Sequence, residues 1–182
     1  MNYESQNELL LYKLMIFYNN YDNLTRMLSI INGESKISLR IVDWFSTNYA
    51  KKYFTIYTTS LNTRFRVYND YKLKLKAYSK RRFDPFCRWD RIKVPFGDKQ
   101  FSIETTIGQL NFFKWAIENG IIKYIEEHYE EIEYDMNTNN SISKSKKHND
   151  SVEKTRKVRE ELSKSAAKCL KKEKVDVTLK FD

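Results

Sequence analysis

The sequence predicts an α+β fold: a helix-rich small domain with one or two short β-hairpins, compatible with a winged-helix-like arrangement, followed by a basic, disordered C-terminal tail. Three observations lead to this prediction. Apolar residues recur at spacings of three and four over much of residues 5–136, which is typical of helices. Runs of β-branched and aromatic residues with polar turns between them occur near residues 54–68 and 91–105. Residues 137–174 are polar, rich in lysine and almost without aromatic rings.

The chain divides by composition into an N-terminal helical segment (1–35), an aromatic-rich α+β core domain (36–136), a basic flexible tail (137–174) and a strand-like C-terminal motif (175–182). Its 182 residues suit one domain with tails. The net charge is +9, and it alternates in sign along the chain. Codon bias in an AT-rich genome explains part of the lysine content but would spread it evenly. The alternation therefore indicates faces of opposite charge.

The first segment is expected to form two short helices within residues 5–31, where the apolar spacing is interrupted once. Asp22 is the expected N-cap of the second helix, and Gly33 is expected to end it. Because the segment carries a small negative charge, its expected role is packing against the core domain rather than binding.

The core domain is expected to begin with a helix that Ser38 caps and that ends near Lys51 and Lys52, since cations favour a helix C-terminus. One apolar stripe of this helix contains Leu39, Val42, Phe45 and Tyr49, with Ile41 beside it. Residues 54–68 then predict a β-hairpin with a polar turn at 60–63.

A basic helix is expected to follow, from Asn69 as its N-cap to Arg82, because Pro85 disfavours helix in the residue before it. Within it, residues 72–78 (KLKLKAY) also alternate as a strand would. The helix is preferred, and both alternatives place Lys72 and Lys76 on a solvated side.

Two strands, 91–96 and 101–105, are predicted next, joined at 97–99. Thr106 and Gln109 form a capping-box pattern, and the helix that follows is expected to end at Gly120. Apolar residues lie on two sides of this helix, which predicts that it is the central helix of the core.

The last predicted elements are an acidic helix and a terminal strand. Residues 121–136 continue as a helix with five glutamates, which either form a solvated face or contact the protein's own basic segment. In residues 175–182 (VDVTLKFD), apolar and polar residues alternate. This end is expected to add a strand to the edge of its own sheet, or alternatively to a partner's sheet.

The segment with the clearest functional signal is 64–94, which holds eleven Lys or Arg against three acids and interleaves them with aromatic rings. Basic side chains neutralise phosphates, and exposed rings stack on bases. The candidate nucleic-acid-binding residues are Arg64, Arg66, Lys72, Lys76, Lys80, Arg81, Arg82, Arg88, Trp89 and Arg91, with Phe86 as a second stacking ring. A purely structural role of the rings in the core is the alternative.

Catalytic signatures are not found. With only four glycines, no phosphate-cradling loop can be written, and Cys87 and Cys169 suggest neither a disulfide framework nor a zinc site. The most enzyme-like set is Asp84, Asp90 and Glu104 near Arg88, Arg91 and Lys93, which could hold Mg²⁺ beside a phosphodiester, but we interpret these acids as ion-pair partners of the arginines. We predict a protein that is not an enzyme and needs no cofactor or metal.

The apolar run at residues 9–11 is too short to span a membrane and lacks the basic start of a signal peptide, so a soluble, non-secreted protein is expected.

Three stretches, SLRIVDWFSTNY, YKLKLKAYSKRRFDPFCR and TTIGQLNFFKWAIENGIIKYI, resemble a family of small proteins of nucleocytoplasmic large DNA viruses, of the mimivirus-like and phycodnavirus-like groups. The resemblance covers roughly residues 36–136. It implies a viral factory in the host cytoplasm, an AT-rich genome and packaging into the virion, and it assigns no site residues.

We therefore predict a non-enzymatic nucleic-acid-binding accessory protein in viral replication, transcription or genome packaging, with DNA favoured over RNA as its partner. The basic tail would add non-specific affinity. The alternative is a virion or assembly protein that binds another viral protein through the acidic helix 121–136 and residues 175–182.

Overall fold

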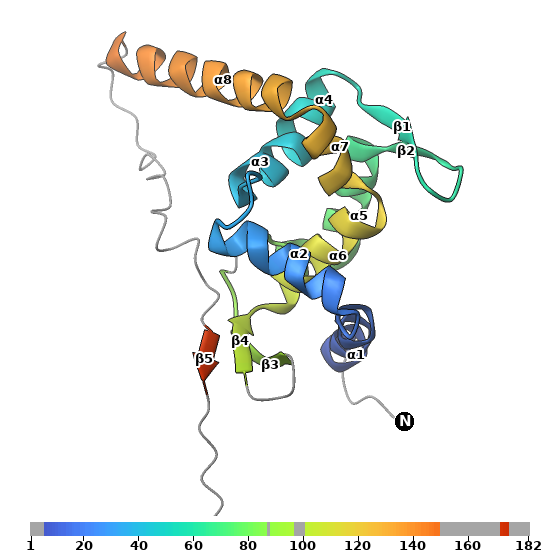
Figure 1. Ribbon diagram of the computed structural model, residues 1–182. Helices are drawn as coiled ribbons and strands as arrows, with labels where there is room; N and C mark the ends of the chain where they lie inside the picture. Colours follow the sequence, from blue (N-terminus) through green and yellow to red (C-terminus); the bar gives the residue numbers. More distant parts are fainter. Residues whose placement is uncertain (1–5, 87, 97–100, 150–171, 175–182) are drawn as a thin grey trace, which may run out of the picture.

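The computed structural model describes residues 6–86, 88–96, 101–149 and 172–174. Helices form the body, and two small antiparallel sheets lie at separate places on its periphery (Figure 1). The predicted helix-rich α+β fold is confirmed, while the winged-helix-like arrangement stays a prediction. In the part of the chain that is described, no helix has both the length and the apolar character that a bilayer crossing requires.

The N-terminal helices are α1 (Gln6–Tyr18) and α2 (Tyr21–Asn32). The predicted N-cap was wrong by two residues: Asn20 caps α2, because its side chain accepts a hydrogen bond from the backbone N–H of Asp22 at 3.0 Å. Asp22 itself lies in the first turn, where a negative charge also favours the helix. Gly33 ends α2 as predicted, in the left-handed conformation with φ 75°.

The next helix is continuous but contains a π-helical turn: α3 (Leu39–Trp44), η1 (Phe45–Tyr49) and α4 (Ala50–Lys52). Ser38 caps it as predicted, since its hydroxyl accepts from the N–H of Ile41 at 3.3 Å. Within the wider turn, the Ser46 and Thr47 hydroxyls donate to the carbonyls four residues earlier, at 2.9 and 2.7 Å. Hydroxyls bonded in this way compete with the helical ladder and often bend it. The predicted apolar stripe is buried.

The predicted hairpin consists of β1 (Ile56–Thr58) and β2 (Arg64–Arg66), and α5 (Val67–Arg82) follows at once. The helix, not the strand alternative, is therefore found at residues 72–78. Asn69 was the wrong N-cap: the helix begins directly after Arg66, which keeps an extended backbone, and so buries Val67. Ser79, at φ 61° and ψ 167°, interrupts α5 just before its basic end.

The second sheet has the order β3-β4-β5, with β3 (Ile92–Phe96) antiparallel to β4 (Phe101–Thr105) and β4 antiparallel to β5 (Lys172–Lys174). The predicted strand pair 91–105 is thus confirmed, with its connection outside the described residues. The predicted terminal strand 175–182 also lies outside them. The three residues just before it form β5 at the edge of the domain's own sheet.

The C-terminal helices are α6 (Ile107–Glu118), α7 (Ile121–Glu127) and α8 (Tyr129–Asn149). Thr106 caps α6 by accepting from the N–H of Gln109 at 3.1 Å. In a capping box the Gln109 side chain would accept a hydrogen bond from the backbone N–H of Thr106. Here it instead accepts from Thr105 Oγ1 at 2.8 Å and donates to the Pro85 carbonyl at 3.0 Å. The helix predicted to end near Met136 runs on to Asn149 and extends beyond the helical body (Figure 1).

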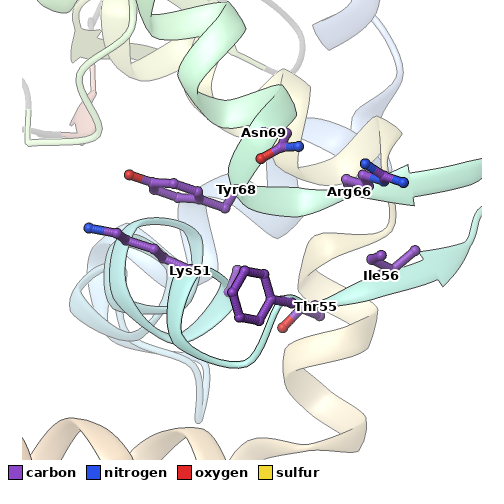
Figure 2. Close-up of a pocket in the computed structure, with 8 residues that line it drawn as sticks. Lys51, Thr55, Ile56, Arg66, Tyr68 and Asn69 are labelled. Carbon is purple, nitrogen blue, oxygen red and sulfur yellow. The ribbon is translucent and has the colours of Figure 1, made fainter.

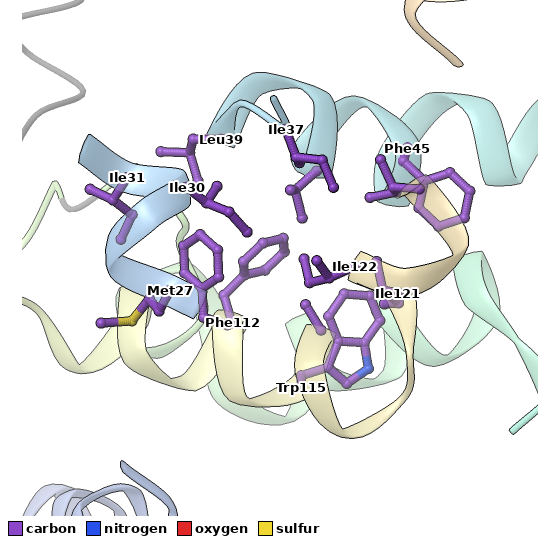
Figure 3. Close-up of a cluster of buried hydrophobic side chains, with 14 of the residues drawn as sticks. Met27, Ile30, Ile31, Ile37, Leu39, Phe45, Phe112, Trp115, Ile121 and Ile122 are labelled. Carbon is purple, nitrogen blue, oxygen red and sulfur yellow. The ribbon is translucent and has the colours of Figure 1, made fainter. Parts of the chain in front are cut away.

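Helix α6 is the centre of the core, as predicted. Leu110, Phe112 and Phe113 on its two sides are fully buried, and apolar residues of α2, α3, η1 and α7 surround it (Figure 3). At its start, Gly108 allows a close approach, since a Cβ there would lie 2.9 Å from the Arg81 carbonyl oxygen. This contact fixes the basic end of α5 against the core.

Asp135 anchors α8 to the helix that precedes the hairpin. Its carboxylate accepts from Lys52 Nζ at 2.5 Å, Trp44 Nε1 at 3.0 Å and the Tyr53 hydroxyl at 3.2 Å. Burial alone would raise the pKa of Asp135, but these hydrogen bonds lower the pKa below its usual value.

Substituting Asp135→Asn is expected to lower the free energy of unfolding at pH 7 by about 1 to 3 kcal/mol, because charge-assisted hydrogen bonds are lost. Because the pKa of Asp135 is lowered in the folded protein, its carboxylate stabilises the fold at pH values above the ordinary pKa of 3.8. This stabilisation is lost as the pH falls below 3.8 and through the lowered pKa. Urea denaturation at pH 7 and pH 3 measures both effects. An equal loss at the two pH values would show that the carboxylate charge is not responsible.

Candidate nucleic-acid interface

Five of the predicted residues on β2 and α5 are exposed, and we call them together the basic face: Arg64, Arg66, Lys72, Lys76 and Lys80. The two arginines flank the buried Phe65 in β2, so alternation directs them to solvent. The helical period places Lys72 and Lys76 next to each other on α5, and both are exposed while Tyr71, Leu75 and Tyr78 pack against the core. Among the described residues, no member of the basic face has an acidic partner within ion-pair distance.

The other predicted arginines are held by partners within the protein. Arg81 pairs with Asp90 at 2.6 Å, Arg88 with Asp84 at 3.3 Å and Arg91 with Glu104 at 3.4 Å. Arg82 donates to two neutral side chains of α1, Asn7 and Gln6, at 2.7 and 3.1 Å. The Arg81 and Asp90 side chains are 62% and 86% exposed. Because such surface pairs contribute little to stability, a phosphate can compete for Arg81.

Trp89 lies at the basic end of α5 and is 44% exposed. Its Nε1 donates to the Lys80 carbonyl at 3.2 Å, and the Arg81 guanidinium lies 5.9 Å from the ring centroid. Phe86 is only partly buried, and the Arg88 guanidinium lies 5.5 Å from its centroid. Both candidate stacking rings are thus partly accessible and beside arginines.

The enzyme-like set of carboxylates is not brought together. Asp84, Asp90 and Glu104 each pair with a different arginine, as the ion-pair interpretation expected. Within the described ranges, no three His, Cys, Asp or Glu side chains are grouped so that they could hold a metal ion.

Asp43 is a carboxyl group that the sequence prediction missed. The pKa of Asp43 is raised to about 6, chiefly by burial and also by the nearby charge of Asp84, while Arg88 acts to lower it. Tyr71 lies in the same group, since burial and then the charges of Asp43 and Asp84 raise its pKa to about 12. The available signal was an acid placed between Val42 and Trp44 in an apolar helix.

Substituting Asp43→Asn is expected to stabilise the protein by about 1 to 3 kcal/mol at pH 7.5, since one pKa unit corresponds to about 1.4 kcal/mol. A raised carboxyl pKa contributes stability at low pH that is lost as the pH rises through about 6. The gain should therefore vanish near pH 4 in thermal unfolding of the two proteins. Destabilisation at pH 7.5 would show that the fold requires the Asp43 anion beside Arg88.

A cavity of about 320 Å³ lies where the end of α4, the base of the hairpin and the start of α5 meet. Lys51, Arg66 and Tyr68 are among its lining residues, with apolar side chains between them (Figure 2). A second cavity of about 190 Å³ is bordered by Lys13, Lys74 and Lys114. Lys74 is therefore turned away from the basic face, and Lys114 is paired with Glu118.

The acidic helix residues are largely engaged locally. Glu133 accepts from the Tyr129 hydroxyl at 2.9 Å, and Glu131 from the Tyr49 hydroxyl at 3.4 Å. Asp135 meets Lys52, which lies outside the 64–94 segment. Among the described residues, no ion pair joins these acids to the 64–94 segment.

Comparison with known proteins gives a family but no activity. The chain is 49% identical over 130 residues to an uncharacterized protein of Acanthamoeba polyphaga mimivirus, which covers 68% of this chain. The chain spans about half the length of that relative. No solved structure matches the chain. The predicted resemblance to a giant-virus family is confirmed by this relative, and because a family model matches residues 2–176, the chain belongs to DUF7197, a family of unknown function.

Proposed function

We propose that this protein is a non-enzymatic nucleic-acid-binding accessory protein of a large DNA virus, acting in replication, transcription or genome packaging. The observation that carries the proposal is the basic face, where five exposed cations on β2 and α5 have no acidic partner among the described residues. Unpaired cations keep their full charge available to phosphates, and binding releases the counterions condensed on the polymer.

The arginines near the end of α5 have a secondary role in this proposal. Arg81 exchanges Asp90 for a phosphate, and Arg82, whose partners are neutral, keeps its charge available. Arg88 and Arg91 remain paired with acids and orient the surface, while Trp89 and Phe86 offer ring area for stacking. DNA is the proposed partner ahead of RNA, and the host cytoplasm, in viral factories, is the proposed location, with packaging in the virion.

Fluorescence anisotropy with the full chain at low salt tests this function. Labelled duplex DNA, single-stranded DNA and RNA of equal length are titrated separately. Saturable binding of at least one of them supports the proposal, and the preferred polymer identifies the partner class. No binding to any of the three rejects it.

A protein-binding function in virion assembly is the second candidate, because α8 extends beyond the helical body (Figure 1) and exposes 74% of Tyr134. The alternative also assigns protein binding to residues 175–182. To test this role, the full chain and a chain lacking these residues are each purified from infected cells. A viral protein that co-purifies only with the full chain supports it, and identical partners in both samples reject it.

A further inference from the structure

The cavity beside the hairpin has the size and the chemistry of a small-ligand site. Its volume of about 320 Å³ falls within the range of about 300–1,000 Å³ that is usual for such sites. Ala50, Phe54, Thr55 and Ile56 provide a largely apolar lining, and Arg66 and Asn69 provide polar groups. This combination suits a flat, apolar group that carries hydrogen-bonding edges and a negative charge.

Tyr68 provides an aromatic surface, and two lysine ammonium groups lie near its ring. Lys51 Nζ lies 5.8 Å and Lys72 Nζ 5.7 Å from its ring centroid. Figure 2 shows Lys51 and Tyr68 extending side by side, while Arg66 and Ile56 come from the two strands of the hairpin. Because Lys72 and Arg66 also belong to the basic face, the cavity opens beside the proposed phosphate contacts.

Phe54 is the unusual residue of this site. It is 83% exposed and has φ 50°, a backbone conformation that is unfavourable for a bulky side chain. The neighbouring backbone fixes this turn, since the N–H of Thr55 donates to the Ala50 carbonyl at 3.2 Å and the N–H of Val67 donates to the Thr55 carbonyl at 3.3 Å. Strain of this kind that is retained at the rim of a cavity is characteristic of functional positions.

We propose that this cavity binds one unpaired nucleotide, with the base against Phe54 and Tyr68, the Asn69 amide at the base edge and the phosphate at Lys51 and Arg66. The inference deepens the proposed function and rests on it. The nucleotide is either one unit of a single strand or a free mononucleotide, and these two sources share the same chemistry.

The test compares Phe54→Ala with the wild type for binding of a single-stranded (dT)₁₀ oligonucleotide, a blunt duplex, dAMP and TMP. Loss of one stacked base is expected to weaken the affinity for the single strand about 5- to 150-fold and to leave duplex binding unchanged. Leu61→Ala is the matched control, because Leu61 is 82% exposed on the same hairpin and does not line the cavity. Thermal unfolding checks that both variants stay folded, and Asn69→Ala provides an independent second variant.

The possible results distinguish failure of the nucleotide site from failure of the proposed nucleic-acid binding. Weakened binding of dAMP or TMP in the Phe54 variant identifies free nucleotides as a ligand, and an effect on the oligonucleotide alone identifies a strand unit; both support the inference. Wild-type affinities in both Phe54→Ala and Asn69→Ala overturn it while the phosphate-binding function stands. Absence of wild-type binding to duplex DNA, single-stranded DNA and RNA alike overturns the proposed function itself.

Discussion

Reversing the charges of Lys72 and Lys76 in the Lys72→Glu, Lys76→Glu variant is expected to lower the affinity for duplex DNA by about 100-fold or more at about 50 mM salt. Both side chains are exposed on one side of α5, so the change removes two phosphate contacts and adds two repulsive charges. Because both lysines are exposed, the fold should be retained. Anisotropy titration together with circular dichroism measures the two properties.

The matched control is Arg26→Glu with Lys123→Glu, which alters the net charge equally. Arg26 lies exposed on α2, and the Lys123 side chain on α7 is 75% exposed. A similar loss of affinity in this control would mean that overall charge, and not the basic face, determines binding. Arg81 and Arg82 are less suitable for this test, because reversing Arg82 would also break its hydrogen bonds to α1.

Truncating Phe83→Ala is expected to lower the free energy of unfolding by about 3 to 5 kcal/mol, the usual effect of removing a fully buried phenylalanine ring. Phe83 is 1% exposed and packs against Phe112 and Trp115, with centroid separations of 5.4 and 5.5 Å. It therefore joins the basic end of α5 to the central helix α6. Urea denaturation of the variant and the wild type gives the difference.

The matched control for this truncation is Leu73→Ala on α5, the helix that ends immediately before Phe83. Leu73 is 65% exposed, and substitutions at such positions usually change stability by less than about 0.5 kcal/mol. Equal destabilisation by the two substitutions would contradict the burial of Phe83 beneath α5.

Local patterns were sufficient to predict most elements. Ser38, Thr106 and Gly33 act as helix caps as expected, and the double apolar stripe of residues 107–118 correctly identified the central helix. The errors concern positions where several local signals compete. Asn20 and Asp22 are both good caps, and the side chain of Gln109 is used by Thr105 and Pro85 instead of the helix terminus.

The site was only partly predictable, because charge density identifies a segment but not the partners of its side chains. The bond from Arg82 to α1 joins residues 75 positions apart in the chain, and no local pattern indicates it. Asp43 and the cavity beside Tyr68 depend in the same way on the packing of the α3–α4 helix against α5 and the hairpin. An exposed Phe54 was likewise indistinguishable from a core ring in an aromatic-rich sequence.

The most direct test of the central claim is the salt dependence of duplex binding by the unmodified protein between about 50 and 200 mM salt. The five cations of the basic face alone predict a slope of log K against log salt of about −4.5, since each phosphate contact contributes about −0.9, and contacts by Arg81 and Arg82 would make the slope steeper. A slope of this size would support a phosphate-binding basic face. A slope near zero, or no duplex binding at the lowest salt, would contradict phosphate binding to a duplex by the basic face.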